Sequence, residues 1–327
     1  MQINVCLATD ENYLKYMATS MVSILKTANK TDDLCFYILC NKISNDSKDY
    51  IKSLKKIKNF SIDFLDINIK DFIDFPRIGP HISNTGYFRY KIAELCHNIS
   101  KIIYLDCDVI VKQSLTELFE TDIGDYYLAG VEDVGYYYWR EKNPKFIYKN
   151  CFYINTGVLL INLEVWRQNN LYNKLVDFTI KEADKIEIGD QDVINAVCKG
   201  KIKELDYKWN VQDSFYRKKP ERCYNPNCSK IIEASKNPAI IHYTNIKKPW
   251  NDKKMARSLD WCYYNYKRIG ENYTFKFIKE ILLIYIYIFL FILKHFIKFV
   301  FNVKTIRIEE DYKIVKILFF KIKRKNI

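Results

Sequence analysis

Two aspartates stand one residue apart in a stretch that is otherwise rich in apolar residues. Asp106 and Asp108 flank Cys107 within residues 101–111. The apolar run predicts a buried strand, and alternate side chains of a strand share a face. Two carboxylates that converge at a strand end repel each other unless a cation lies between them, and a hard divalent ion suits that place. Two solvated aspartates at a strand end would show the same pattern.

Other polar residues follow other predicted strands. His242 follows two isoleucines in the predicted strand 240–243, and Lys247 and Lys248 come soon after it. Beside the two aspartates, an imidazole would complete an O,O,N ligand set suited to Mn²⁺ or another borderline divalent ion. The lysines could meet phosphates. Taken alone, His242 also fits a structural histidine, and the two lysines also fit solvated surface.

The segments around these residues predict an α/β protein. Strand-like and helix-like patterns alternate, which is typical of a mostly parallel sheet with helices on both faces. In such sheets ligands bind beyond the carboxyl ends of the strands, where Asp10 and the Asp106/Asp108 pair fall. The predicted strands are 3–8, 34–39, 60–65, 127–131, 157–162 and 240–243. The predicted helices are 13–28, 47–57, 86–96, 163–182 and 193–198, with loops or irregular chain at 135–150 and 210–237.

Composition indicates a globular protein. The chain has 327 residues, of which 49% are hydrophobic and 28% charged, so it can bury one large core or two modest ones. Its ten cysteines include no CxxC pair, and Cys223 and Cys228 have no second pair to complete a zinc site. The first residues have the pattern of a strand and not that of a signal peptide, so we expect a reducing cytoplasm.

Six segments, in order, resemble glycosyltransferase family 8, which includes bacterial lipopolysaccharide galactosyl- and glucosyltransferases and glycogenin. The likeness is strongest to the lipooligosaccharide α-galactosyltransferase branch, and it covers about residues 3–250. The segments are ATDENY at 8–13, YFR at 87–89, YLDCD at 104–108, NTGVLLIN at 155–162, GDQDVIN at 189–195 and HY…KPW at 242–250.

The resemblance implies a GT-A fold and a retaining transfer of a hexose from a UDP-sugar to a glycan acceptor. Galactose is favoured over glucose, a lipopolysaccharide or lipooligosaccharide core is the expected acceptor, and Mn²⁺ (or Mg²⁺) is the expected cofactor. The family pattern also carries a glycine three residues after the metal histidine, where this chain has Asn245.

The resemblance also assigns roles to individual residues. Asp106, Asp108 and His242 match metal ligands, and Ala8, Asp10 and Asn12 match a uridine-binding turn. Lys248 matches a lysine that meets the diphosphate, and the backbone of Cys107 would meet the ribose. Residues matching the surroundings of the donor sugar are Arg89, Asp133, Asn155, Asp190 and Gln191, of which Asp133, Asp190 and Gln191 are the catalytic candidates.

The C-terminal segment has a different character from the rest. Residues 281–293 are uninterrupted apolar or aromatic residues, about 20 Å as a helix against the ~30 Å of a bilayer core. Residues 276–327 hold twelve Lys/Arg and four Asp/Glu. We expect a catalytic domain at 1–255 and a helical region at 256–327 that lies on the cytoplasmic face of an anionic membrane. The tail is too apolar for a nucleic-acid arm, and a dimer-forming or core-packing helix is the alternative.

Two other functions remain possible from the sequence. The YLDCDV stretch also resembles the haloacid-dehalogenase phosphatase motif, but Ile110 stands where that motif has a threonine, and the motif would normally lie in the first strand. A non-catalytic protein that binds membranes or polyanions would rest on the basic tail alone.

Overall fold

The computed structural model describes residues 1–76, 84–136, 152–216, 225–245, 248–251 and 260–270, together with Tyr285, Ile286, Phe289 and Leu293. The chain divides into two compact units, Met1–Glu271 and Asn272–Ile327. Outside the described residues lie most of the predicted loop 135–150, Cys223 of the Cys223/Cys228 pair, and nearly all of the tail. The predicted functional boundary at residue 255 stays a prediction.

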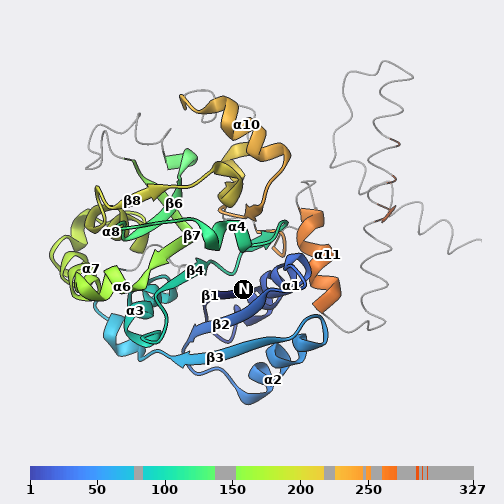
Figure 1. The fold of residues 1–327 in the computed structure, drawn as a ribbon, viewed down its shortest axis with the longest axis horizontal. Helices are drawn as coiled ribbons and strands as arrows, with labels where there is room; N and C mark the ends of the chain where they lie inside the picture. Colours follow the sequence, from blue (N-terminus) through green and yellow to red (C-terminus); the bar gives the residue numbers. More distant parts are fainter. Residues whose placement is uncertain are drawn as a thin grey trace, which may run out of the picture. The chain divides into compact units, whose positions relative to one another are not determined.

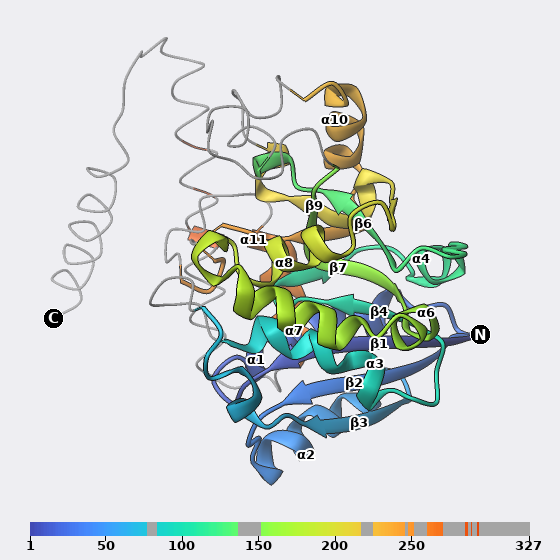
Figure 2. The ribbon, with the colours of Figure 1, turned by 90° about the vertical axis from the view of Figure 1, so that its left-hand side faces the viewer.

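The first unit is built on a seven-stranded sheet in the order β3-β2-β1-β4-β7-β6-β8 (Figures 1 and 2). Every neighbouring pair is parallel except the two that β7 makes, with β4 and with β6. The prediction of a mostly parallel sheet is therefore confirmed. The strands are β1 Gln2–Thr9, β2 Asp33–Cys40, β3 Phe60–Asp66, β4 Lys101–Leu105, β6 Leu128–Glu132, β7 Ile154–Asn162 and β8 Ile202–Glu204.

Helices cover both faces of this sheet (Figure 2). Alternate residues of β1 show the division, since Val5 and Leu7 belong to one core cluster and Cys6 belongs to the other. The first cluster takes in α1 Leu14–Thr27 and α2 Asn45–Ser53. The second takes in α3 Ile92–Leu95, α6 Leu163–Gln168, α7 Leu171–Lys181 and α8 Asp190–Val197.

A small second sheet carries His242 toward the aspartates. Its order is β5-β10-β9, with β5 Val109–Val111, β9 Val211–Gln212 and β10 Ile240–His242. β10 runs antiparallel to β5, with His242 opposite Val109, and the Tyr243 amide donates to the Asp108 carbonyl at 3.0 Å. Sequence-distant strands thus place the histidine beside the aspartate turn.

Several elements differ from the prediction. The stretch 101–111 is two strands in two sheets, because the chain turns at the aspartates. The predicted helix 163–182 is interrupted where Asn170 takes a left-handed φ of 52° between α6 and α7. Residues 84–91 form a 3-10 helix ahead of α3, and the region predicted as irregular, 210–237, contains β9 and the helix α10 Cys228–Lys236.

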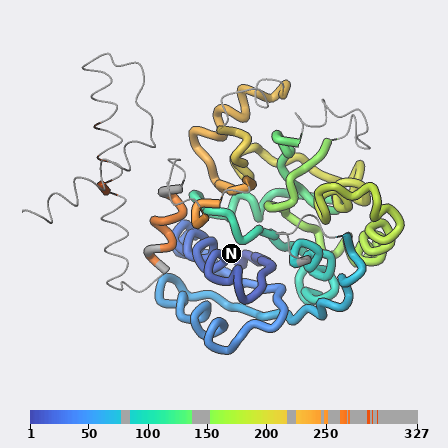
Figure 3. The backbone as a smooth tube through the Cα atoms, turned by 180° about the vertical axis from the view of Figure 1, so that it is seen from behind, coloured from blue at the N-terminus to red at the C-terminus, as the bar shows by residue number. Residues whose placement is uncertain are grey.

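The remaining helices are short or lie at the end of the first unit. They are α4 Thr116–Glu120, the 3-10 helices Leu54–Lys56, Ile69–Phe72, Ala183–Lys185, Tyr207–Asn210 and Asp213–Tyr216, and α11 Asp260–Gly270. α11 lies against α1, as the view from behind shows (Figure 3). Among the described residues, no helix combines the length and apolar character that crossing a membrane requires.

Candidate functional site

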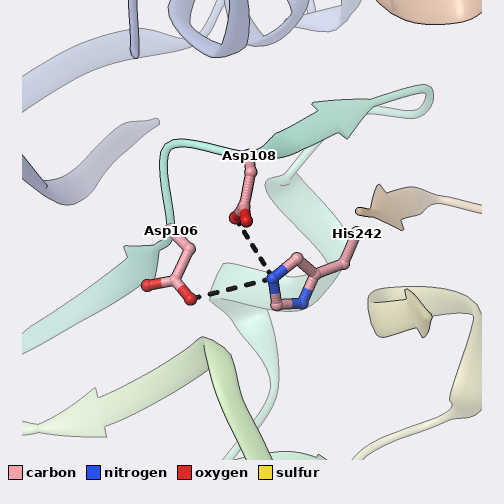
Figure 4. Close-up of side chains that lie close together, drawn as sticks. All are labelled: Asp106, Asp108 and His242. Carbon is pink, nitrogen blue, oxygen red and sulfur yellow. Dashed lines mark ion pairs between the residues drawn. The ribbon is translucent and has the colours of Figure 1, made fainter. Parts of the chain in front are cut away.

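The central feature is a turn that carries two carboxylates between β4 and β5. Asp106 follows β4 and Asp108 precedes β5, so the turn, and not the alternation of one continuous strand, makes them converge (Figure 4). His242 reaches them from β10. One potential ligand atom from each of the three residues lies within 4.8 Å of the others. The predicted trio is therefore brought together in space.

The His242 ring is buried and aims one nitrogen at both carboxylates. Its Nε2 lies 3.2 Å from Asp108 Oδ1 and 3.7 Å from Asp106 Oδ2. Burial alone would lower the pKa of His242, but Asp108 and Asp106 raise it above its usual value. Burial would likewise raise the pKa of Asp108, yet Lys248 and His242 hold it well below its usual range. The site therefore places two carboxylates around one nitrogen of a buried imidazole.

The backbone of Gly157 forms one wall of this site. The Asp106 amide donates to the Gly157 carbonyl at 2.8 Å. A Cβ atom on Gly157 would stand 2.1 Å from His242 Cε1 and 2.7 Å from Asp106 Oδ2. Real Cβ atoms do not approach other atoms so closely, so the site requires glycine here.

A divalent ion fits these residues. Two carboxylates and one imidazole form a mixed oxygen–nitrogen donor set, which suits Mn²⁺ and related ions. Asp106 and Asp108 retain side-chain exposures of 30% and 13%, so the carboxylates face accessible space. Asp106, Asp108 and His242 would hold such an ion, which would offset their converging charge.

Lys248 adds a cation on the other side of Asp108. Its Nζ lies 2.7 Å from Asp108 Oδ2 and also donates to the Tyr243 carbonyl. The lysine side chain is 18% exposed. Lys247, the neighbouring lysine of the predicted pair, lies outside the described residues. Lys248 thus contacts the aspartate turn while part of its side chain stays accessible to an anionic ligand.

Arg89 connects the candidate metal ligand Asp106 to Asp190. Its Nη2 lies 2.9 Å from Asp106 Oδ1, its Nε lies 3.1 Å from Asp190 Oδ2, and its Nη1 donates to the Thr156 carbonyl at 2.6 Å. Burial would lower the pKa of Arg89, but Asp190 and Asp106 raise it well above its usual value. The guanidinium, stacked 4.2 Å over the Tyr104 ring, is therefore a fixed positive charge between two carboxylates.

A hydrogen-bonded cluster of side chains joins Asp133, Asn155 and Gln191. Gln191 Oε1 accepts from Asn155 Nδ2 at 3.1 Å and from the Thr156 amide at 3.2 Å. Its Nε2 donates to Asp133 Oδ2 at 3.1 Å and to the Tyr153 hydroxyl at 3.3 Å. Both the oxygen and the nitrogen of the buried Gln191 amide therefore already form hydrogen bonds within the protein.

The predicted nucleotide turn follows β1, next to the end of β4. Leu7 pairs with Leu105, which sets Ala8 beside the aspartate turn, and the Cys107 thiol donates to the Ala8 carbonyl at 3.1 Å. Asp10 Oδ1 accepts from the Tyr13 amide at 2.8 Å ahead of α1. Asn12 is exposed in this turn. Among the described residues it makes no resolved contact with Asp106 or Asp108.

Sequence reasoning missed three contributors to the site. Asn210 contacts His242, Tyr104 donates to Asp106 Oδ1 at 3.1 Å, and Tyr153 donates to Asp192 at 2.6 Å. Tyr104 stands two residues before Asp106, on the predicted strand, so its side could have been inferred. Asn210 offered no such signal, because the chain around it was predicted to be irregular.

The comparisons with known proteins agree with one another. The sequence profile of Glycosyl transferase family 8 matches residues 4–254. A Haemophilus influenzae protein named only as a glycosyltransferase is 32% identical over 77% of this chain and 74% of its own length. The Escherichia coli lipopolysaccharide glucosyltransferase WaaO is 30% identical over 76% of this chain and 74% of its own length.

Solved structures give the same result. The galactosyltransferase LgtC, crystallised with donor and acceptor sugar analogs, superposes with a TM-score of 0.75 at 26% identity, covering 85% of this chain and all of that one. The predicted GT-A fold is thereby confirmed.

Proposed function

The chain belongs to glycosyl transferase family 8, and from this premise we propose that it moves a hexose from a UDP-sugar to a glycan acceptor with retention at the anomeric carbon. The observation that carries the proposal is the trio Asp106, Asp108 and His242, with Lys248 beside it, at the end of the central strands. This is the place where open α/β sheets bind ligands. The phosphatase alternative loses its support, because the motif follows β4 and not the first strand.

The donor would lie along the turn after β1. Ala8, Asp10 and Asn12 would hold the uridine, and the backbone of Cys107 would meet the ribose. The buried, hydrogen-bonded thiol supports a structural side chain at position 107, since burial raises the pKa of Cys107 well above its usual value. The diphosphate would then lie beside Lys248 and beside the divalent ion that Asp106 and Asp108 would hold.

Departure of UDP is the step for which this site is suited. A divalent ion held by Asp106, Asp108 and His242, with Mn²⁺ favoured and Mg²⁺ as the alternative, would supply electrostatic stabilisation of the leaving diphosphate. The Lys248 ammonium would stabilise the same charge from its position 2.7 Å from Asp108. Arg89 would orient Asp106 and Asp190 through its two ion pairs.

Retention follows most simply from attack on the face that UDP leaves. The C1–oxygen bond to the diphosphate breaks, the acceptor hydroxyl oxygen bonds to C1, and its proton passes to the departing diphosphate oxygen. The alternative, double displacement, needs a nucleophile at Gln191 or Asp190. The Gln191 carbonyl oxygen already accepts two hydrogen bonds, and Asp190 pairs with Arg89 at 3.1 Å, which supports the front-face route. Asp133 would position the sugar through Asn155 and Gln191.

The proposed acceptor is the core of a lipopolysaccharide or lipooligosaccharide. WaaO is a lipopolysaccharide glucosyltransferase and LgtC a galactosyltransferase, and we favour galactose as the donor sugar here. The loops at 135–150 and 213–230 are the candidate acceptor contacts. Residues 137–150 of the first loop and 217–224 of the second lie outside the described residues.

We also propose that residues 256–327 hold the enzyme on the cytoplasmic face of an anionic membrane. Three exposed apolar side chains in this region, Tyr285, Phe289 and Leu293, recur at every fourth position. Helical residues four apart lie on one face, so these side chains would form an apolar stripe between basic flanks. No nucleic-acid partner is proposed.

The deciding experiment is UDP release from UDP-galactose and UDP-glucose, with Mn²⁺, with Mg²⁺ and with chelator, with and without a core oligosaccharide. We expect metal-dependent release that the acceptor accelerates and a product with the donor's anomeric configuration by NMR. Asp106→Asn should abolish it, whereas Asp49→Asn, at an exposed surface ion pair, should not. Absence of release with every donor, together with vesicle binding, would favour the non-catalytic alternative.

A further inference from the structure

We propose that Asn210 is a positioning residue that fixes the tautomer of His242, so that the lone pair on Nε2 faces Asp106 and Asp108. The inference rests on the proposed function, because it assigns a residue to the same divalent ion. Asn210 is fully buried at the end of the 3-10 helix Tyr207–Asn210. Its Oδ1 lies 3.0 Å from His242 Nδ1, the ring nitrogen remote from the carboxylates.

The orientation of a neighbouring amide, that of Asn155, is determined first. A backbone N–H can only donate, and the Gly157 amide lies 3.1 Å from Asn155 Oδ1. A carboxylate can only accept, and Asp133 Oδ2 lies 3.3 Å from Asn155 Nδ2. Both neighbours require the same orientation, with the Asn155 oxygen toward Gly157 and its nitrogen toward Asp133.

The orientation of Asn210 follows from that of Asn155. Asn155 Oδ1 also lies 2.9 Å from Asn210 Nδ2, and an oxygen acceptor at that place requires the amide nitrogen of Asn210 to face it. The carbonyl oxygen of Asn210 must then face the imidazole. Because a carbonyl oxygen only accepts, His242 Nδ1 carries the hydrogen. Asp108 Oδ1, 3.2 Å from Nε2, also only accepts, but Asp108 has Lys248 as a second partner at 2.7 Å and is partly exposed. Asn210 is fully buried and its amide is fixed by Asn155, so we infer that the neutral ring keeps its hydrogen on Nδ1 and holds its lone pair on Nε2.

This arrangement gives Asn210 a measurable role. A histidine that binds a metal usually donates its other N–H to an oxygen acceptor, and loss of that partner costs about 10–100-fold in metal affinity. The chain of amides also joins the ion to the proposed sugar site, since Asn155 contacts Gln191 and Asp133 as well as Asn210.

The direct test is the tautomer of His242 in the metal-free full-length protein. The chain has four histidines, His81, His97, His242 and His295, so selective ¹⁵N-histidine labelling gives four ring systems, and His242→Gln assigns one. At a pH above its titration, we expect a protonated Nδ1 and a lone pair on Nε2. A hydrogen on Nε2, or an even mixture of tautomers, would overturn the inference. Glycosyl transfer plays no part in this measurement, so the inference and the proposed function can fail separately.

Variants of Asn210 test the consequence. Asn210→Leu keeps the side-chain shape, excludes water and removes the acceptor, so Mn²⁺ affinity by calorimetry should fall about 10–100-fold and the tautomer should become mixed. Asn210→Asp keeps an acceptor for Nδ1 and should restore the single tautomer, although it removes the donor to Asn155 Oδ1. Asn4→Leu is the control, because Asn4 is a buried amide that donates to the Lys101 carbonyl near the opposite end of β1. Equal Mn²⁺ affinity in Asn210→Leu and the wild type would refute the role. If Asn210→Leu does not fold, the wild-type tautomer still decides.

Discussion

Gly157 and His242 lie so close together that a single carbon added to Gly157 would overlap the imidazole. The Cβ position is 2.1 Å from His242 Cε1 and 2.8 Å from Nδ1. His242 is buried and held by Asn210, so the ring has little room to retreat. The glycine therefore determines the position of a proposed metal ligand that lies 85 residues further along the chain.

Gly157→Ala should accordingly disrupt the ion site. The added methyl would displace the ring or Asp106, and we expect Mn²⁺ affinity to fall at least tenfold and stability to fall by about 1–3 kcal/mol. Calorimetry with Mn²⁺ and thermal unfolding measure the two effects. Gly130→Ala is the matched control: its Cβ would meet Ile154 Cδ1 at 2.7 Å, and a terminal methyl can rotate away. Equal metal affinity in the Gly157→Ala and wild-type proteins would contradict the prediction.

The sequence predicts most of this fold because its signals are local. β1, β2 and β3 were predicted to within about one residue at each end, since alternating and apolar patterns persist over eight, eight and seven residues. The failures come where tertiary contacts override such patterns. The helix predicted at 163–182 breaks at Asn170, which has a left-handed φ. The spacing of apolar residues does not indicate such a backbone conformation.

The site could be predicted only in part for the same reason. Asp106 and Asp108 are two residues apart, so one short sequence motif contains both and predicts that they lie together. Asn210 contacts His242 only because β9 and β10 pair in parallel, and that pairing joins segments about thirty residues apart. No pattern within either segment encodes the contact. Roles for Asp133, Asp190 and Gln191 remain predictions.

Lys248→Gln should separate chemistry from metal binding. Without the ammonium, the leaving diphosphate loses a stabilising charge, and turnover should fall by about 10²–10³-fold. Asp108 also loses a competitor for its Oδ2, so Mn²⁺ affinity should hold or rise. UDP-release kinetics and Mn²⁺ titration measure the two quantities. The control is Lys208→Gln, which removes a lysine paired with Glu117 at 2.7 Å on the surface and should leave both near wild type. A Lys248→Gln enzyme with more than half the wild-type turnover would refute the assignment.

Metal binding should be weaker at low pH and should release a proton. Asp108 and Asp106 raise the pKa of His242 against the effect of burial, so the metal-free protein protonates Nε2 below that pKa, and the ion must displace the proton. Below it, Mn²⁺ affinity should fall about tenfold per pH unit.

The sign for stability follows from the same shift. A group whose pKa is higher in the folded than in the unfolded state stabilises the fold at pH values below its unfolded-state pKa. That contribution is lost as the pH rises through the folded-state pKa. The gain in Tm on adding Mn²⁺ should therefore grow with pH. Calorimetry in two buffers of different ionisation enthalpy counts the protons, and Mn²⁺ affinity that stays constant as pH falls well below the measured pKa of His242 would contradict the assignment.

The place at which the chain is truncated should matter for catalysis as well as for membrane binding. Trp250 stacks on Tyr16 with ring centroids 4.0 Å apart, and the Tyr264 hydroxyl of α11 donates to the Pro249 carbonyl at 2.9 Å. These contacts brace the segment that carries Lys248. A chain ending at residue 271 retains them, whereas a chain ending at 255 loses α11.

We therefore expect the 271-residue chain to keep wild-type UDP release while losing recovery on anionic vesicles, and the 255-residue chain to lose most of its turnover as well. Tyr264→Phe in the full chain removes the hydrogen bond alone and should lower turnover by less than the truncation does. Vesicle flotation and UDP-release assays on the same preparations provide both readouts. Full turnover in the 255-residue chain would place the functional boundary where the sequence predicts it, because Lys248 would then be positioned without α11. Unchanged vesicle recovery for the 271-residue chain would reject the membrane role of the tail.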